Sequence, residues 1–358
     1  MSDNQGQNSQ TNGGKLAPPD RATLADVARL ADVSTAVVSY VLNNGPRKVS
    51  DDLRIRVEQA IAQLGYRRNR LASALISGKS NLVGLLVPDA SNPFYGELAR
   101  EVEKEAHARG YMTLIGNTGH EVATERNYLQ AMGDLRVRGI FVTSVNDQEE
   151  DMGTSPIIYL HAAPQAAVRN RVLFDDFAGG VLATRHLIGL GYHEIFCLAG
   201  DSDFGPFMQR RLGWQRAMSD AGLPFAGRHH HVSSDRLVAA RQIRGLVEQN
   251  RGLRAIFATS DEQALAALRA AAETGCQVPG DIAIVGFDGI REALLGGVRL
   301  TTIALPIRQL VVQAFDRLEA APGDAIPDSP LAGELVIGET CGAGAGNSAL
   351  DLRPRPGA

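Results

Sequence analysis

Hydrophobic residues recur at helical spacing in three short runs near the N-terminus. Each run begins just after a residue whose side-chain oxygen can cap a helix. The runs cover residues 24–31, 37–42 and 53–64, and the capping residues are Thr23, Ser34 and Ser50. Because the segment Ala31–Ser34 leaves a connection of only three or four residues between the first two helices, the pattern predicts a helix-turn-helix. A domain of three such helices is too small for a large catalytic core.

The pattern changes at residue 82, where short apolar runs begin to alternate with longer helical patterns. The alternation starts with a strand at Leu82–Val87 and a helix at Phe94–Arg109, and it continues to a strand at Ile282–Gly286. It is typical of a parallel sheet that is covered on both faces. About 250 residues of this pattern exceed one open sheet of usual width, so we expect two Rossmann-like α/β lobes with a ligand cleft between them.

Charge is distributed unevenly along the 358-residue chain. The formal net charge is −4, which by itself disfavours a nucleic-acid partner. However, residues 21–80 contain ten basic and five acidic residues, whereas residues 81–358 contain 25 basic and 33 acidic residues. The basic excess therefore coincides with the predicted helix-turn-helix, which is the arrangement expected of a DNA-binding head on an acidic body.

Composition also disfavours a membrane or secreted protein. No apolar run approaches 18 residues, and the polar N-terminus lacks a basic and apolar signal segment. The three cysteines, Cys197, Cys276 and Cys341, are widely spaced and form no C-x-x-C motif. We therefore expect reduced thiols and a cytoplasmic protein, with a disordered tail at residues 1–20.

Several motifs follow one another in the order found in a known family. They include T23-L-A-D-V-A-R-L-A-D-V-S34-T-A-V-V-S39-Y-V-L-N43, G65-Y66-R-R-N69-R-L-A-S-A-L75 and L82-V-G-L-L-V-P88, followed by F174-D-D-F-A-G-G180 and V285-G-F-D288. Together they closely resemble the lactose/galactose repressor (LacI/GalR) family of bacterial transcription factors. The resemblance covers roughly residues 23–340.

This resemblance implies a homodimeric transcriptional regulator, most simply a repressor, that binds a palindromic operator in double-stranded DNA. It also implies a core like that of periplasmic binding proteins, which binds a small effector. The expected parts are a tail (1–20), a helix-turn-helix domain (21–66), a hinge helix and linker (67–80), a two-lobed core (81–340) and a flexible tail (341–358). No leucine heptads follow the core, so we expect no tetramer held by a C-terminal coiled coil.

The second predicted helix can present a DNA-reading face. Ser34 would cap it, and the core face would take Val37, Val38, Val41 and Leu42, leaving Thr35, Ala36, Ser39 and Tyr40 outside. The resemblance implies that Thr35, Ala36 and Tyr40 read bases and that Thr23, Leu24, Ser39 and Asn43 lie near phosphates. Family members usually have Thr at the position of Val37, and we expect Arg47 and Lys48 to supply phosphate contacts instead.

Residues 66–78 are expected to form a second DNA element. Arg67, Arg68 and Arg70 bring positive charge, and Asn69 can start a short helix. In the family this hinge helix pairs with its dimer mate in the minor groove, and Leu75 occupies the position of the leucine that enters between base pairs. Arg68 stands where the family usually has Pro, so the start of the hinge differs here.

Candidate effector residues follow from the rule that ligands bind beyond the carboxyl ends of parallel strands. The rule selects residues 89–95, His161, Ser260, Asp261 and Asp288. The resemblance places His161, Arg210, Ser260 and Asp288 at effector-contacting positions, with Arg211 as the alternative to Arg210. A family aromatic is replaced by Ser234. The resemblance favours a sugar or a related small polar metabolite as the effector. Phe94 and Tyr95 can stack on a ring, so a purine or nucleoside that acts as a co-repressor is the alternative.

Other functional classes find less support. Ser77–Ser80 lacks the first glycine of a P-loop, and the glycine-rich segment Gly342–Gly346 is not preceded by the strand that a dinucleotide-binding turn requires. Neighbouring residues of His229–His231 point to opposite faces of an extended segment, so at most two of them could share a metal ion. We therefore expect no cofactor, no metal and no enzyme activity. A solute-binding receptor with the same core is the main rival, although it predicts an export signal and no basic head.

Overall fold

The computed structural model describes residues 22–43, 49–66, 80–144, 146, 155–164, 170–200, 204–250, 252–321 and 329–343. The chain separates into two compact units, residues 1–77 and 78–358, and each unit is described by itself. The expected N-terminal tail, Arg47, Lys48 and most of the hinge lie outside the described residues.

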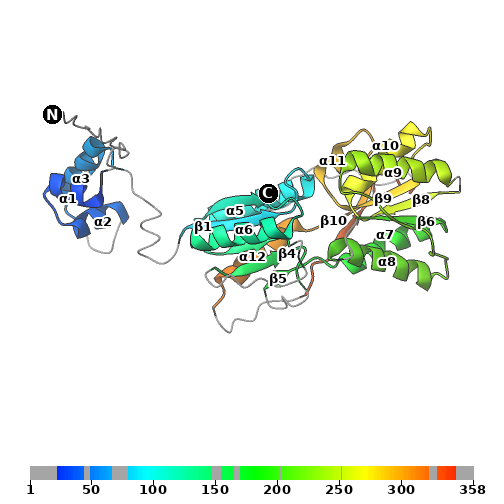
Figure 1. The fold of residues 1–358 in the computed structure, drawn as a ribbon, viewed down its shortest axis with the longest axis horizontal. Coiled ribbons are helices and arrows are strands. Elements are labelled where there is room, and N and C mark those ends of the chain that lie inside the picture. The colour runs from blue at the N-terminus through cyan, green and yellow to red at the C-terminus, as the bar shows by residue number, and fades with distance from the viewer. Residues whose placement is uncertain are drawn as a thin grey trace, which may run out of the picture. The chain divides into compact units, whose positions relative to one another are not determined.

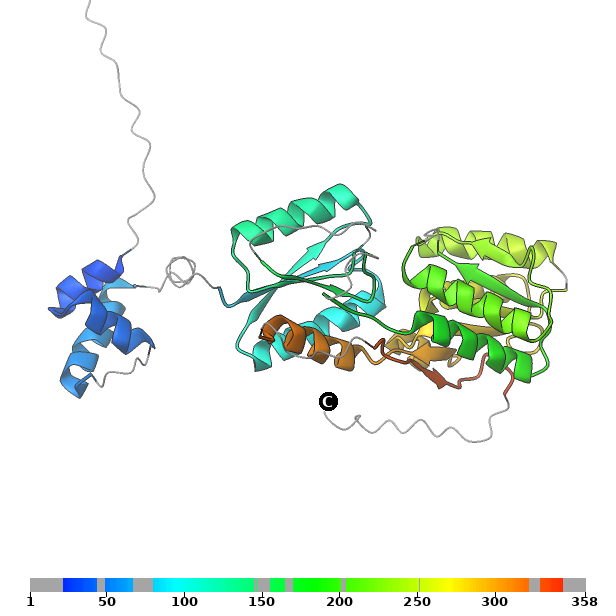
Figure 2. The same ribbon diagram turned by 90° about the horizontal axis from the view of Figure 1, so that it is seen from below.

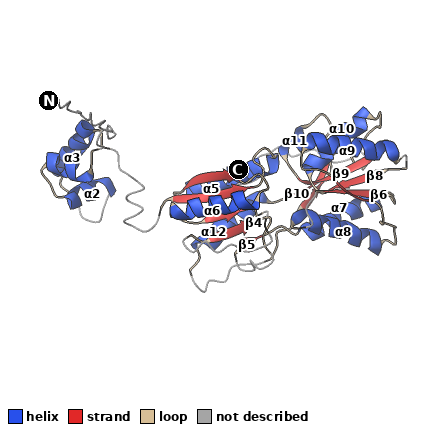
Figure 3. Cartoon of the chain, in the orientation of Figure 1, coloured by secondary structure: helices blue, strands red, loops and turns tan. Residues whose placement is uncertain are grey.

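The described residues of the first unit form three helices (Figure 3), whose buried side chains make a small apolar core. They are α1 (Leu24–Ala31), α2 (Thr35–Asn43) and α3 (Asp51–Leu64). The buried side chains that join them are Val27, Ala28, Ala31, Val38, Val41, Val57 and Ala60. The three predicted helical runs are confirmed, and the short turn at residues 32–34 connects α1 to α2.

The expected helix starts differ in how they are capped. Thr23 and Asp26 form a reciprocal capping box at α1, and the Val37 N–H donates to Ser34 Oγ at 3.4 Å. At α3 the prediction was wrong in detail, because Ser50 is the N-cap residue but its side chain makes no capping hydrogen bond. Asp51 and Asp52 lie in the first turn of α3. Their negative charges there interact favourably with the positive end of the helix dipole.

The second unit has two α/β lobes, as the alternation predicted (Figure 1). Lobe 1 holds a five-stranded parallel sheet in the order β2-β1-β3-β4-β5. Its strands are β1 (Leu82–Val87), β2 (Met112–Asn117), β3 (Ile140–Val142), β4 (Ile157–Leu160) and β5 (Arg171–Val172). Its helices are α5 (Pro93–Ala108), α6 (Val122–Asp134) and α12 (Ile307–Glu319).

Lobe 2 holds a six-stranded sheet in the order β11-β10-β9-β8-β6-β7, in which only the β10–β11 pair is antiparallel. Its strands are β6 (Ile195–Ala199), β7 (His229–His231), β8 (Ala255–Ala258), β9 (Ala283–Asp288), β10 (Thr301–Ala304) and β11 (Glu334–Val336). Its helices are α7 (Asp176–Gly189), α8 (Pro206–Asp220), α9 (Arg236–Gln249), α10 (Asp261–Glu273) and α11 (Arg291–Leu295).

Helix α12 returns from lobe 2 to lobe 1, where it packs against α5 (Figure 2, orange). Phe315 is fully buried, and Arg109, the residue that follows α5, forms ion pairs with Asp316 and Glu319 of α12 at 2.7 Å each. The predicted alternation of strands and helices ended at residue 286. It therefore missed β10, α12 and β11. Cys341 and Ala343 also pack against the main core, so the core continues past residue 340.

Candidate functional site

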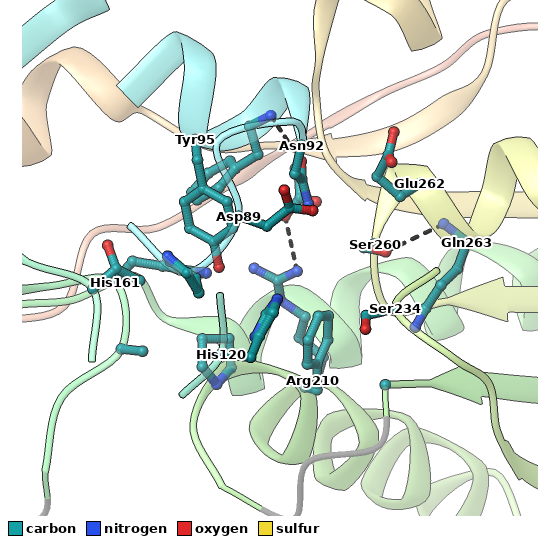
Figure 4. Close-up of a pocket in the computed structure, with 18 of the residues that line it drawn as sticks. Asp89, Asn92, Tyr95, His120, His161, Arg210, Ser234, Ser260, Glu262 and Gln263 are labelled. Atoms are coloured by element: carbon teal, nitrogen blue, oxygen red, sulfur yellow. Dashed lines mark hydrogen bonds and ion pairs between the residues drawn. The ribbon is translucent and has the colours of Figure 1, made fainter. Parts of the chain in front are cut away.

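A cavity of about 450 Å³ lies between the two lobes (Figure 4). Residues at the carboxyl ends of strands line it from both sides, as expected for parallel sheets. Lobe 1 contributes residues after β1, β2, β3 and β4. Lobe 2 contributes residues after β6, β7 and β8, the last residue of β9 and the start of α8. All six predicted effector residues line this cavity: Phe94, Tyr95, His161, Arg210, Ser260 and Asp288.

The turn between β1 and α5 builds one wall. Asn92 caps α5 by accepting a hydrogen bond from the Phe94 N–H at 2.9 Å, and Pro93 occupies the first helical turn. Asp89 Oδ1 accepts from the backbone N–H and the hydroxyl of Ser91, at 2.8 and 2.7 Å. These local bonds direct Phe94 and Tyr95 from the start of α5 toward the cavity.

Phe94 and His161 form an aromatic contact in lobe 1. Phe94 is 2% exposed, its ring centroid is 4.7 Å from that of His161, and it meets Tyr95 edge to face at 5.2 Å. Phe94 is thus mostly packed into the lobe, whereas Tyr95 is half-buried. Burial raises the pKa of Tyr95 and keeps the phenol protonated as a hydrogen-bond donor.

His161 is a neutral group that lines the cavity. Its backbone is left-handed, with φ of 62°, at the point where the chain leaves β4. Burial, assisted by the positive charge of Arg210, lowers the pKa of His161 well below its usual value. Its Nδ1 atom is buried and has no hydrogen-bond partner among the described residues. Thr143, at the end of β3, likewise has a buried Oγ1 without such a partner.

Arg210 of α8 lies between two carboxylates on the lobe 2 side. Its Nε donates to Asp176 Oδ1 at 2.7 Å, and its Nη1 donates to Asp288 Oδ1 at 2.8 Å and to the Thr259 carbonyl at 2.6 Å. The guanidinium carbon lies 3.8 Å from the centroid of the Phe287 ring. Its Nη2 atom is buried without a partner among the described residues, so one donor remains for a ligand.

Two glycines allow α7 and α8 to approach closely enough to form this arrangement. A Cβ atom at Gly180 would lie 2.3 Å from the Arg210 carbonyl oxygen, and one at Gly213 would lie 2.3 Å from the Phe177 carbonyl oxygen. Both contacts are with backbone, which has no side-chain rotamer that could move away. The close approach brings Asp176, at the start of α7, next to Arg210.

The loop after β9 orients Asp288. Asp288 has φ of 119°, and Asp261 Oδ2 accepts from the following N–H groups of Gly289 and Ile290 at 2.8 and 2.9 Å. Thr302 Oγ1 donates to Asp261 Oδ1 at 2.6 Å. Burial raises the pKa of Asp288 to about 6, and it also raises the pKa values of Asp176 and Asp261.

The other predicted site residues have simpler surroundings. Ser260 caps α10, because its Oγ accepts from the Gln263 N–H at 3.3 Å. In the first unit Thr35 and Ala36 are exposed, and Ser39 and Tyr40 are half-buried. Leu24 packs against the head core, whereas Val37, expected on the core face, is half-buried and outside the core cluster. The side chain of Asn43, and all of Arg47, Lys48, Asn69 and Leu75, lie outside the description.

Sequence reasoning did not select Asp176, Thr143, Arg236 or Glu262 as site residues. Arg236 forms an ion pair with Glu262 and donates from Nη2 to the Ser91 carbonyl of lobe 1 at 2.7 Å. Only the strand-end rule could have found Thr143, because it directly follows β3. No local signal indicates the link between Arg236 and Ser91.

Two further structural checks concern metals and membranes. In the part of the chain that the structure describes, no three His, Cys, Asp or Glu side chains are grouped to hold a metal ion. His229 and His231 lie on one face of β7, with ring centroids 4.4 Å apart. Over the same described ranges, no helix combines the length and apolar character needed to span a bilayer.

Comparison with known proteins identifies both units. Residues 23–69 match the family of bacterial regulatory proteins of the lacI type, and residues 80–324 match the periplasmic binding proteins and sugar binding domain of the LacI family. The transcriptional regulator DegA of Bacillus subtilis is 33% identical, with 81% of this chain and 88% of that protein covered.

Two further relatives extend over the same range. The transcriptional repressor PurR of Aliivibrio fischeri is 32% identical, covering 83% of this chain and 90% of the relative. A structure of the lac repressor dimer bound to operator and an anti-inducer has the same fold, with a TM-score of 0.78 and 24% identity over 90% of this chain and 99% of that one.

Proposed function

Because the chain belongs to the LacI family of bacterial regulatory proteins and is a DNA-binding transcriptional regulator, not an enzyme, we propose specific roles for its residues. The core binds a small effector in the cavity between its lobes, and the effector controls operator affinity. The observation that carries this proposal is the cavity itself, where buried atoms of Thr143, His161 and Arg210 lack protein partners among the described residues. Buried polar groups of this kind are expected to bond to a ligand or water.

In the head, helix α2 enters the major groove. Thr35, Ala36 and Tyr40 read base edges, while Thr23, Leu24, Ser39 and Asn43 lie near phosphates. The exposure of Thr35 and Ala36 at the first turn of α2 supports this role, because N-terminal residues of a recognition helix meet the bases. Ser34 fixes the start of the helix, and Arg47 and Lys48 add contacts to phosphates.

Dimerisation completes the DNA-binding surface. Two heads bind the half-sites of a palindromic operator, and two hinge segments starting near Asn69 meet in the minor groove, where Leu75 enters between base pairs. The structure of the lac repressor dimer on its operator, which has the same fold, supports this assembly. We place the protein in the cytoplasm, where the DNA is.

A gel-shift experiment with full-length protein and a palindromic operator library tests the DNA-binding role. Salt-sensitive, sequence-selective binding is expected, and its absence would contradict the proposal. Leu75→Ala should weaken operator binding much more than binding to random DNA. Equal losses on both DNAs would contradict the role of Leu75 in the minor groove.

A conservative variant tests the effector site. Arg210→Lys keeps a positive charge between Asp176 and Asp288 but removes the Nη2 donor, so it should abolish the effector response while operator binding persists. Arg216→Lys on the same helix is the control. Arg216 is exposed, and among the described residues its ion pair is with Asp220. An unchanged response in Arg210→Lys would place the effector site elsewhere.

The direction in which the effector changes operator affinity distinguishes an inducer from a co-repressor, which is the second candidate function. If the effector strengthens operator binding, the protein uses a co-repressor, as a purine or nucleoside effector acting through Phe94 and Tyr95 would. Titrating metabolites into the operator complex decides between the two signs.

A further inference from the structure

Two hydrogen bonds join the start of α5 and the turn before it, in lobe 1, to lobe 2. In the first, Arg236 donates from Nη2 to the Ser91 carbonyl at 2.7 Å. In the second, the backbone N–H of Arg291 donates to Glu97 Oε1 at 3.0 Å. Glu97 is half-buried and is not among the described residues that line the cavity. Its link to the cavity is therefore indirect, through the loop that leads to Arg291.

Four consecutive residues, 288–291, connect the cavity to Glu97. Asp288 is the first of them, and it lines the cavity. The next two backbone N–H groups donate to Asp261 of lobe 2, at 2.8 and 2.9 Å, and the third donates to Glu97 of lobe 1. An effector that contacts Asp288 therefore acts on a loop whose other end is bonded to lobe 1.

The loop at residues 288–291 is packed too tightly to absorb a movement without passing it on. A Cβ atom at Gly289 would lie 2.6 Å from the Cα atom of Ala304, so backbone packs directly against backbone there. Ile290 is 1% exposed. The Asp288 carbonyl accepts from the Leu305 N–H at 3.1 Å, just before the chain returns to lobe 1 in α12. Close-packed interiors transmit strain, so a displacement of Asp288 is expected to displace the end of the loop as well.

Glu97 belongs to a well-packed part of lobe 1. It lies on α5 directly before Leu98, which is fully buried, and three positions after Phe94, which is 2% exposed. Helix α5 packs against β1, β2 and α12. Lobe 1 is also the lobe that follows the helix-turn-helix unit along the chain. The bond at Glu97 therefore acts on the lobe to which the DNA-binding unit is joined.

We propose that Glu97 is a positioning residue for the control of operator affinity. Its bond to the Arg291 N–H favours one arrangement of the two lobes, and operator affinity depends on that arrangement. The proposal rests on the DNA-binding and effector roles assigned above. It goes further by assigning part of the regulation to a residue that lies outside both the cavity and the head.

Pulsed EPR on the full-length protein tests the effect on lobe arrangement. Labels are placed at Gln130→Cys of α6 in lobe 1 and Gln249→Cys of α9 in lobe 2, in a Cys276→Ser background. Glu97→Ala removes the acceptor, so the ratio of molecules with the lobes in contact to molecules with the lobes apart should fall by about fivefold. Glu97→Gln keeps an Oε1 acceptor and should restore most of the wild-type distribution. Glu103→Ala, an exposed position on the same helix, should leave the distribution unchanged.

Operator binding tests the coupling, because two linked equilibria must shift each other in the same sense. A duplex carrying the palindrome selected from the operator library is titrated against each variant, and its effect on the wild-type distance is measured in parallel. If this duplex shortens the distance between the lobes, Glu97→Ala should weaken operator binding by about three- to fivefold. If the duplex lengthens the distance, Glu97→Ala should strengthen binding by a similar factor. Glu97→Gln and Glu103→Ala should bind the duplex like the wild type.

The outcomes separate this proposal from the DNA-binding role. Unchanged distances in Glu97→Ala, or equal changes in Glu97→Gln or Glu103→Ala, would overturn the role of the Glu97 bond in lobe arrangement. A wild-type distance that operator DNA does not alter, or an operator affinity that Glu97→Ala leaves unchanged or shifts in the opposite sense, would overturn its role in regulation while operator binding stands. A wild-type protein that selects no operator from the library would contradict the DNA-binding role itself, and this proposal with it.

Discussion

Arg210 and Asp176 form an ion pair that is almost entirely removed from solvent. The Nε and Oδ1 atoms are 2.7 Å apart, and the two side chains are 1% and 5% exposed. The pair joins α8 to the start of α7 behind the ligand cavity. Desolvation of such a pair is costly, so its main role is to hold Arg210 in one orientation rather than to add net stability.

Loss of the Arg210 charge should destabilise the core strongly. Arg210→Met retains much of the side-chain volume but leaves Asp176 and Asp288 buried without a countercharge, so we expect a loss of about 3–5 kcal/mol in the free energy of unfolding. Urea denaturation measures this loss. Arg216→Met, which breaks an exposed pair on the same helix, should cost less than about 1 kcal/mol. Similar losses in the two variants would contradict the buried ion-pair account.

Core stability should depend on the protonation of Asp288. Burial raises its pKa from 3.8 to about 6, so the folded state binds more protons than the unfolded state between these values. The contribution of Asp288 to stability is therefore highest below pH 4 and declines as the pH rises to about 6. Urea denaturation from pH 4 to 7 should show this decline in the wild type, and a smaller one in Asp288→Asn. Identical slopes would contradict the raised pKa.

Arg236, which lines the cavity, should hold the two lobes together. It donates to the Ser91 carbonyl of lobe 1 while it is paired with Glu262 of lobe 2. Arg236→Ala should widen the distance between lobes and weaken effector binding by about fivefold, since a partly exposed charge-assisted hydrogen bond contributes about 1 kcal/mol. Pulsed EPR on labels at Lys104→Cys and Gln249→Cys, in a Cys276→Ser background, measures the distance.

Arg244→Ala is the matched control for Arg236→Ala. Both residues lie on α9, and their side chains are about half exposed, at 51% for Arg244 and 50% for Arg236. Arg244, however, pairs with Glu248 of the same helix. It should leave the distance between lobes unchanged. An equal change in both variants would indicate an effect on α9 and not on lobe closure.

Thr35 should contribute to operator selectivity. It is exposed at the first residue of α2, where a hydroxyl can meet a base edge. Thr35→Ala should lower operator affinity by about five- to tenfold, from about 1 kcal/mol of lost contact, and relax the base preference at one position. Selection from a randomised operator library measures this preference. Gln63→Ala, exposed on α3, should retain the wild-type preference.

Sequence alone determined the local elements, because helices and strands follow the period of apolar residues. The head helices at residues 24–31 and 51–64 and the alternating strands from Leu82 onward are of this kind. The sequence also identified Arg210 and Asp288 as candidate effector residues. The family resemblance indicated both, and the rule that ligands bind beyond strand ends indicated Asp288 as well. Capping at Ser50 was predicted wrongly, because a residue type suited to a cap does not guarantee the side-chain bond.

Only the tertiary structure decided which charges meet. Asp176 and Arg210 are 34 positions apart and come together because Gly180 and Gly213 let α7 and α8 pack backbone against backbone. Arg236 and Ser91 are 145 positions apart and meet only when the lobes do. Periodicity records how each segment buries its own apolar face, whereas pairing between buried charges depends on how distant segments pack, which no local pattern specifies.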